Sequence, residues 1–274
     1  MRRNWAAGGP SELPTLADLR QNFLEKHGAS NGLAWSTARR LKAEYFLPAD
    51  VYEATVAKHV DEGTAWLDVG GGHHIFPEHP RLARSLVSKC ASVAAVDPDP
   101  TVLENDFVTE RHQCLLEDFA DGQRFDLATL RMLAEHVDQP ARLVRALRAL
   151  LRPDGKVIVL TVNRWSPVSI LSRLVPFGLH HPIKRRFWGG DERDTFPVRY
   201  LMNTRATLRR LFEGAGFHES AFAYLDDLST FGQFKWMGAT ELSLWSGLSR
   251  AGIVYPENCL LGIYRLSDAK LPGP

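Results

Sequence analysis

The chain has 274 residues, of which 45% are hydrophobic, and its formal net charge is +1. It is long and apolar enough for one sizeable core with an appendage, and its charge gives no reason to expect nucleic acid or an acidic membrane as a partner. We find no apolar run that could span a bilayer or serve as a signal peptide. The three cysteines (Cys90, Cys114 and Cys259) are widely spaced and fit no disulfide or metal framework, so we expect a soluble cytoplasmic protein.

Helical periodicity dominates the first part of the chain. Apolar residues recur at helical spacing between Leu16 and Leu24, and Pro48 is suited to the first turn of a later helix. After a loose tail we predict helices over residues 15–27, 36–45 and 48–60. They either cap the sheet that follows or pack on it as a layer, and we assign residues 1–60 to an N-terminal tail and helical cap.

From residue 64 onward, strand and helix patterns alternate. Short apolar runs predict strands over 64–69, 91–96, 113–116, 126–130 and 156–162. Helices are predicted between them over 80–89, 101–105 and 139–151, the last ended by the turn Arg152-Pro-Asp-Gly155. Such alternation implies a mostly parallel sheet with right-handed crossovers.

An insert rich in aromatic and basic residues interrupts this alternation after the fifth strand, over residues 163–200. The pattern then predicts a helix over 204–215, a strand over 217–225, a helix over 228–251 and a final strand over 258–266. The last helix is unusually aromatic, and its Trp236 and Trp245 suit a homodimer interface as well as a core.

The first strand ends in a glycine-rich loop. Asp68 is followed closely by Gly70, Gly71 and Gly72. Glycines permit unusual backbone angles and close approach of a ligand, and parallel sheets bind ligands at the carboxyl ends of their strands. By itself this motif is equally consistent with a plain strand-to-turn connection.

Three further features follow this loop at fixed intervals. Asp97 ends the second strand, where an acid can accept hydrogen bonds from both hydroxyls of a ribose. Glu117 and Asp118 follow the third strand, and Asp126 opens the fourth. Together with the turn before the fifth strand, these features resemble a class I S-adenosylmethionine-dependent methyltransferase over about residues 60–266.

The resemblance implies the fold and the cofactor. The fold would be α/β and Rossmann-like, with a seven-stranded, mostly parallel sheet in the order 3-2-1-4-5-7-6 and helices on both faces. Residues 61–274 would form the methyltransferase domain, with 163–200 as a lid over the acceptor. S-adenosylmethionine would lie across the carboxyl ends of strands one, two and four, and S-adenosylhomocysteine would be the product.

The family pattern also implies which residues contact the methionine and ribose of the cofactor. Asp68, Gly70, Gly71 and Gly72 should line the methionine and ribose part. Asp97 should hold the ribose 2′- and 3′-hydroxyls. The alternative for Asp97 is a simple helix N-cap.

Five more contacts are implied at the ends of strands two to four. Pro98 should lie beside the adenine, with Glu117 as the acid of that site and Leu116 in apolar or backbone contact. Leu130 and Arg131 should approach the methionine portion through their backbone. The alternative for Asp118 is a simple turn residue without a ligand contact.

The residues after the glycines argue against two other kinds of site. His74 replaces a third glycine that many family members carry, and Ile75 stands where a nicotinamide-binding fingerprint requires Gly or Ala. His73, His74 and His79 lack supporting carboxylates or cysteines, so we expect no metal site.

His136, just past the fourth strand, is the candidate general base for a hydroxyl or amine acceptor. The alternative is a helix-start histidine bonded to the backbone. The pair Glu135-His136 also resembles the corresponding pair of ubiquinone-type O-methyltransferases, in which an upstream acid helps to hold a metal. Met132 occupies that upstream position here.

The insert is where the family commonly builds its acceptor pocket. Its candidate substrate-binding residues are Arg164, His180, His181 and Arg185, because arginines beside aromatic residues can bind a carboxylate or phosphate and stack on a ring. A solvated basic surface is the alternative for residues 184–186.

We therefore predict in-line methyl transfer to a small-molecule acceptor, anionic or aromatic, at a hydroxyl oxygen, with nitrogen or carbon as the alternatives. The competing functions are an inactive scaffold that keeps the fold and a nicotinamide oxidoreductase.

Overall fold

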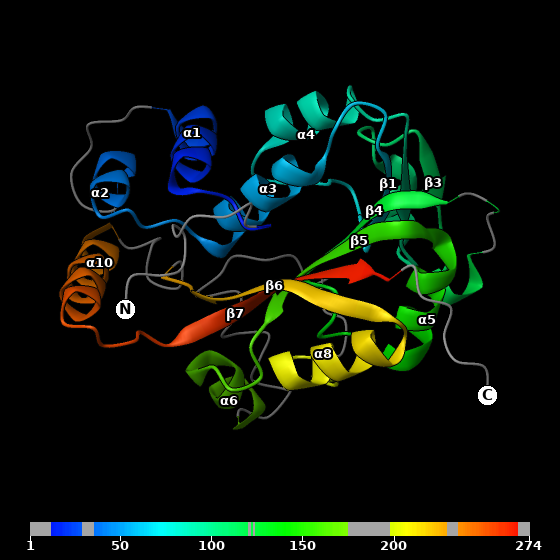
Figure 1. Cartoon of the computed structure of the whole chain (residues 1–274). Coiled ribbons are helices and arrows are strands. Elements are labelled where there is room, and N and C mark those ends of the chain that lie inside the picture. The colour runs from blue at the N-terminus through cyan, green and yellow to red at the C-terminus, as the bar shows by residue number, and fades with distance from the viewer. Residues whose placement is uncertain are drawn as a thin grey trace.

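The computed structural model describes residues 12–28, 36–119, 122, 124–174, 198–228 and 235–267. Its centre is a seven-stranded sheet in the order β3-β2-β1-β4-β5-β7-β6 (Figure 1), which confirms the expected order. The strands are β1 (Ala65–Val69), β2 (Ser92–Val96), β3 (Glu110–His112), β4 (Phe125–Arg131), β5 (Leu151–Val162), β6 (Phe217–Asp226) and β7 (Glu257–Leu266). Strands β1 to β5 pair in parallel, and β7 pairs antiparallel with both β5 and β6.

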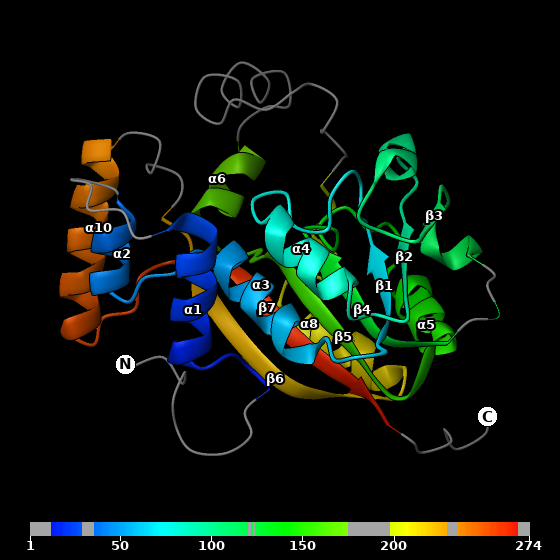
Figure 2. The same ribbon diagram turned by 90° about the horizontal axis from the view of Figure 1, so that it is seen from above.

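Helices cover both faces of the sheet (Figures 1 and 2). One face carries α1 (Leu16–His27), α3 (Pro48–His59) and α4 (Pro80–Val87), and the other carries α5 (Pro140–Leu150) and α8 (Arg205–Gly214). Because both faces are covered, the central strands are apolar almost throughout, and all five residues of β1 are buried. The described part of the chain contains no helix that is long and apolar enough to cross a membrane.

Local sequence signals explain where the helices begin. Thr15 and Asp18 form a reciprocal capping box at the start of α1, and Thr204 caps α8. Prolines open α3, α4 and α5, where the missing N–H has no helical partner in any case. The other helices of the described residues are α2 (Thr37–Lys42), α6 (Pro167–Leu174), α10 (Lys235–Arg250) and the short 3-10 helices η1 (Pro100–Glu104) and η2 (Leu116–Asp118).

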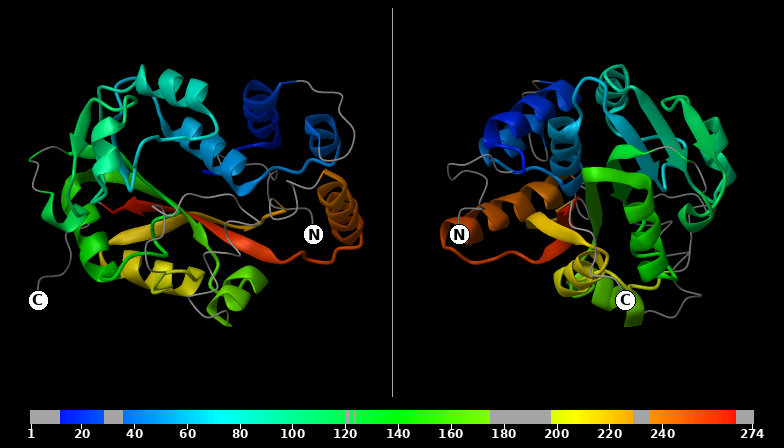
Figure 3. Two further views of the ribbon diagram at one scale, coloured as in Figure 1. Left: turned by 180° about the vertical axis from the view of Figure 1, so that it is seen from behind. Right: turned by 45° about the vertical axis from the view of Figure 1, so that its right-hand side comes forward.

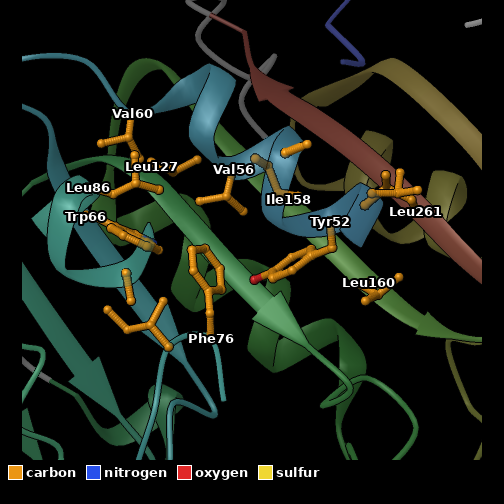
Figure 4. Packing of buried hydrophobic residues seen from close by; sticks show 14 of the residues in the cluster. Tyr52, Val56, Val60, Trp66, Phe76, Leu86, Leu127, Ile158, Leu160 and Leu261 are labelled. Carbon is orange, nitrogen blue, oxygen red and sulfur yellow. The ribbon is translucent and has the colours of Figure 1, made fainter. Parts of the chain in front are cut away.

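The core between α3 and the sheet is tightly interlocked (Figure 4). Tyr52 and Val56 of α3 point onto the sheet and are fully buried together with Trp66 of β1. Phe76, from the segment after the glycine loop, packs edge-on against Tyr52 with ring centroids 6.0 Å apart. This packing fixes α3 on the face of the sheet formed by β1, β4 and β5.

The aromatic helix α10 lies next to α2 at one end of the molecule (Figure 3). Trp245 is buried and packs edge-on against Tyr45, with ring centroids 5.0 Å apart, and its indole N–H donates to the carboxylate of Asp226. Trp236 on the same helix is 75% exposed. The two tryptophans therefore play different parts, and Trp245 belongs to the core.

Two predicted elements were wrong. The third strand is Glu110–His112 and not residues 113–116, because a polar edge strand shows no apolar run; the apolar Leu116 instead starts η2. The turn Arg152–Gly155 lies within β5, between the register pairs Phe125–Leu151 and Leu127–Lys156, with Asp154 in the left-handed region at φ 63°. The strand therefore begins at Leu151 and bulges through the turn.

A buried cluster of charges ties the N-terminal helices together around Asp50. Its carboxylate accepts hydrogen bonds from Arg40 at 2.6 Å, Lys26 at 3.1 Å and the backbone N–H of Leu47 at 3.0 Å, and His27 lies 3.2 Å away. Burial would raise the pKa of Asp50, but the bond from His27 and the charges of Arg40 and Lys26 outweigh it and hold the pKa well below its usual range.

We expect Asp50→Asn to destabilise the protein by about 3 kcal/mol at pH 7, because Arg40 and Lys26 would lose their shared charge while buried. Since the folded pKa is depressed, this contribution is present above the unfolded value of about 4 and is lost as the pH falls below it. Urea unfolding at pH 7 and at about pH 3, below the unfolded value, measures both effects. Glu213→Gln, at an exposed pair with Arg209, is the control; equal losses in the two variants would contradict the role of the cluster.

Candidate functional site

A cavity of about 490 Å³ lies at the carboxyl ends of β1, β2 and β4, which is within the usual size range of small-molecule sites. Among the described residues, the predicted site residues that line it are Gly70, Asp97, Pro98, Leu116, Glu117 and His136. The chain therefore brings together residues that are up to 66 positions apart, from four separate loops. The other predicted residues of this edge, Asp68, Gly71, Gly72, Leu130 and Arg131, lie beside the cavity and not in its lining.

The glycine loop needs its glycines for different reasons. Gly70 and Gly72 have φ angles of 76° and 40°, in the left-handed region that side chains disfavour. A Cβ on Gly71 would lie only 2.7 Å from Oδ2 of Asp68 and 3.3 Å from the Cβ of Ala95. The loop therefore presents bare backbone toward the cavity and packs closely on β2.

Asp97 is held at the end of β2 by two backbone N–H groups. The N–H of Gly72 donates to Oδ2 at 3.1 Å and that of Asp99 donates to Oδ1 at 2.8 Å. Burial raises the pKa of Asp97, and these two bonds oppose the rise. The N-cap of η1 is Asp99, whose side chain accepts from the N–H of Thr101 at 2.9 Å, so Asp97 is not the cap of this helix.

Asp68 is buried on the side of β1 that faces α3. Its Oδ1 accepts a 2.7 Å hydrogen bond from Thr129 of β4. Burial raises the pKa of Asp68 to about 7, while Thr129 and the nearby charge of Arg131 oppose the rise and Asp97 adds to it. The acid at the end of the first strand therefore supports the glycine loop from beneath.

His136 and its neighbour Glu135 point in different directions. His136 lines the cavity, and its backbone N–H donates to Leu133 at 2.9 Å within a turn that precedes α5, so it is not the first residue of a helix. Glu135 is buried and accepts a 2.7 Å hydrogen bond from Thr161 of β5. Burial raises the pKa of the Glu135 carboxyl, and the Thr161 bond counteracts this.

The turn into this segment carries backbone strain. Met132, which lines the cavity, has a φ of 51°, in the region that non-glycine residues seldom adopt, and its N–H donates to Leu160 at 2.8 Å. This conformation redirects the chain out of β4 so that Leu133 and His136 come back over the cavity. Strained residues of this kind gather at functional sites.

The predicted acceptor residues are placed only in part. Arg164 donates to the carbonyl of Tyr200 at 3.2 Å, and its guanidinium lies 5.9 Å from the ring centroid of Trp165. Among the described residues it is not part of the cavity lining. His180, His181 and Arg185 lie outside the described residues.

The sequence did not point to three charged residues of the cavity, which are Asp138, Arg142 and Arg199. Arg142 lies in the first turn of α5, and Arg199, at the end of the insert, forms an ion pair of 2.6 Å with Asp138. The first turn of a helix that follows a strand of a parallel sheet starts at the ligand-binding edge. That rule points to Arg142, whereas nothing in the sequence marked Arg199.

Within the described residues, no group of three or more His, Cys, Asp and Glu side chains is arranged to hold a metal ion. The histidines after the glycine loop differ in surroundings. His73 is half exposed and lies 3.5 Å from Glu104, and His79 is buried 3.5 Å from Glu53.

Comparison with known proteins agrees with this geometry. Residues 17–218 match the family model described as "methyltransferase domain". The chain is 28% identical over 183 residues to the ubiquinone biosynthesis O-methyltransferase of Xanthomonas axonopodis pv. citri, covering 60% of this chain and 74% of the relative. It is 27% identical over 190 residues to the enzyme of the same name from Xanthomonas campestris pv. campestris, covering 63% and 77%.

Solved structures share the fold at low sequence identity. The YcgJ protein from Bacillus subtilis superposes with a TM-score of 0.50 at 12% identity, covering 80% of this chain and 99% of that chain. A chain of the complex between the Haloferax volcanii Trm112 methyltransferase activator and a methyltransferase gives a TM-score of 0.50 at 14% identity, covering 79% and 89%.

We expect Asp97→Asn to raise the Kd for S-adenosylhomocysteine by roughly 10- to 100-fold from a micromolar wild-type value, since hydrogen bonds to a charged acceptor are worth about 1.5–3 kcal/mol. Isothermal titration calorimetry measures the change. Asp126→Asn makes the same substitution at the opposite end of the sheet, where Asp126 pairs with Arg152 at 2.6 Å, and serves as the control. Unchanged affinity in Asp97→Asn would remove this residue from the cofactor site.

Proposed function

This chain belongs to the methyltransferase domain family, and on that premise we propose that it transfers the methyl group of S-adenosylmethionine to a hydroxyl oxygen of a small-molecule acceptor. Dependence on S-adenosylmethionine follows from the family, whereas the acceptor and the atom methylated are our proposal. The observation that supports it most directly is that His136 lines the same cavity as Gly70 and Asp97. The names of the two Xanthomonas relatives, both O-methyltransferases, support the choice of oxygen.

The residues at the carboxyl edge suit this cofactor. The cavity volume is sufficient for a nucleoside, and the glycine loop leaves backbone uncovered beside Asp97, whose carboxylate would accept the ribose hydroxyls. Pro98 and Leu116 would flank the adenine, with Glu117 at its polar rim. Gly71, Gly72, Leu130 and Arg131 would support the methionine end from behind the lining.

When bound, S-adenosylmethionine supplies an electrophilic methyl group on a sulfonium, and an in-line displacement passes it to the acceptor. His136 would accept the proton of the attacking hydroxyl at a ring nitrogen, which is worth roughly 10²–10⁴-fold in rate. The turn around Met132 and the backbone bond to Leu133 hold His136 over the cavity, so the chain contributes orientation as well as a base.

We propose that the acceptor is anionic or aromatic. Arg142 and Arg199 give the cavity two cationic side chains. Arg199 pairs with Asp138, whereas Arg142 donates to the neutral side chain of Gln139 at 3.3 Å. Arg164 beside Trp165 remains a proposed acceptor contact, as do His180, His181 and Arg185. We further propose that the helices within residues 1–60 and the insert 163–200 close over the acceptor.

The cellular setting is part of the same proposal. The three cysteines are free thiols, which favours a reducing cytoplasm. A homodimer through α10 is favoured by its exposed apolar residues Trp236, Met237 and Leu244.

We expect His136→Ala to lower kcat by about 10²-fold or more while leaving the Kd for S-adenosylhomocysteine within about threefold of wild type, because a base acts on the acceptor and not on cofactor binding. Transfer of radiolabelled methyl groups to a panel of hydroxybenzoates, catechols and matched anilines measures the rate and the atom methylated. His218→Ala, at an exposed position on β6, is the control. Methylation of the anilines alone, or an unchanged rate in His136→Ala, would contradict the proposal.

A further inference from the structure

Three buried side chains form a chain of hydrogen bonds beneath the glycine loop. The indole Nε1 of Trp66 donates to Oγ1 of Thr129 at 2.8 Å, and Oγ1 of Thr129 donates to Oδ1 of Asp68 at 2.7 Å. Trp66 and Thr129 are fully buried, and Asp68 is 3% exposed. This series of hydrogen bonds runs from Trp66 of β1 to Thr129 of β4 and back to Asp68 of β1, on the face of the sheet that α3 covers.

Chemistry fixes the direction of the first of these hydrogen bonds, and the distances favour one direction for the second. An indole N–H is a donor only, so the oxygen of Thr129 must accept from Trp66. The single hydroxyl hydrogen of Thr129 is then left for an acceptor, and Oδ1 of Asp68 at 2.7 Å is closer than the carbonyl of Leu67 at 3.5 Å. Thr129 therefore presents a donor to Asp68, and a donor favours the ionised carboxylate.

Other groups near Asp68 shift its pKa, some upward and some downward. Arg131, at the end of β4, favours the charged form, whereas Asp97, at the end of β2, disfavours it. Tyr52 of α3 is a further titratable group near Asp68 among the described residues, and its fully buried ring brings no charge. Because burial raises the pKa of Asp68 to about 7, a small change in its surroundings changes its protonation near neutral pH.

The second oxygen of Asp68 connects this cluster to the glycine loop. Oδ2 lies 2.7 Å from the position that a Cβ on Gly71 would occupy, so the carboxyl packs directly against the loop backbone. Gly70, one residue earlier, lines the cavity. A positive charge placed at the loop would therefore act on Asp68 at short range.

We propose that Thr129, oriented by Trp66, is the positioning residue that holds Asp68 against the glycine loop, and that Asp68 releases a proton to solvent when the cofactor binds there. This inference rests on the proposed placement of the cofactor at the carboxyl edge. Both S-adenosylmethionine and S-adenosylhomocysteine carry an ammonium group, and a cation beside a carboxyl group favours its ionised form. Binding and deprotonation are then linked, so each strengthens the other.

The sign of the linkage decides the expected pH profile. Asp68 is protonated in the free protein below about pH 7 and ionised in the complex, so affinity rises with pH and levels off above about pH 7. Where the free form is protonated and the bound form ionised, the Kd falls by about tenfold for each pH unit. Thr129→Val removes the donor, which raises the pKa of the free carboxyl further and shifts the plateau to higher pH.

The test is isothermal titration calorimetry of S-adenosylhomocysteine between pH 6 and pH 9, in buffers with different ionisation enthalpies that report proton release. We expect wild type and Thr129→Ser to release a proton and to reach their plateau near pH 7. Thr129→Val should bind about as tightly as wild type at pH 9 but distinctly more weakly at pH 7. Should Thr129→Val not fold, Trp66→Phe makes the same test, since without the indole the hydroxyl of Thr129 can turn to Leu67.

Two outcomes distinguish a failure of the proposed cofactor placement from a failure of the proposed role of Thr129. If Asp68→Asn binds S-adenosylhomocysteine as wild type does at every pH, the proposed cofactor placement is wrong. If Asp68→Asn weakens binding but the profiles of wild type and Thr129→Val are parallel, the placement stands and the positioning role of Thr129 is overturned. If wild type releases no proton on binding, the proposed deprotonation of Asp68 is overturned.

Discussion

The loop after β1 is the constraint on which the rest of the site depends. Its Gly70 N–H donates to the carbonyl of Val96 at 2.9 Å, and its Gly72 N–H donates to Asp97. These two hydrogen bonds hold the loop against the end of β2. Side chains are excluded at this crossing, because a Cβ on Gly71 would meet Asp68. The acid that suits a ribose and the bare backbone that suits close ligand approach are therefore products of one packing arrangement.

The two faces of the sheet serve this loop differently. On one face, α3 is held by the Asp50 cluster and by aromatic packing, and it covers the buried hydrogen bonds that join Trp66, Thr129 and Asp68. On the other face, α5 and η2 leave the cavity open beside Pro98 and His136. The fold thus supports the glycine loop with buried charges and hydrogen bonds on one face of the sheet, and leaves the cavity accessible on the other.

The sequence was informative where buried strands meet glycines or acids, because periodicity and chain reversal are local properties. The motifs at these points carried the family resemblance, which implied the strand order, and they placed Gly70, Asp97 and His136 at one edge, where the structure has a cavity. The sequence missed β3 because an edge strand with polar residues carries no apolar signal, and it read the Arg152–Gly155 turn as a break because turn residues cannot report a bulge within a strand. Arg199 and the Thr129 bond to Asp68 depend on contacts between distant segments, which no local pattern encodes.

A crystal structure of the protein with S-adenosylhomocysteine tests the central claim most directly. The account predicts the ribose hydroxyls within hydrogen-bond distance of Asp97, the adenine between Pro98 and Leu116, and the sulfur on the side of the cavity that His136 lines. A nucleoside bound away from the carboxyl ends of β1, β2 and β4, or bound there without contact to Asp97, would contradict it.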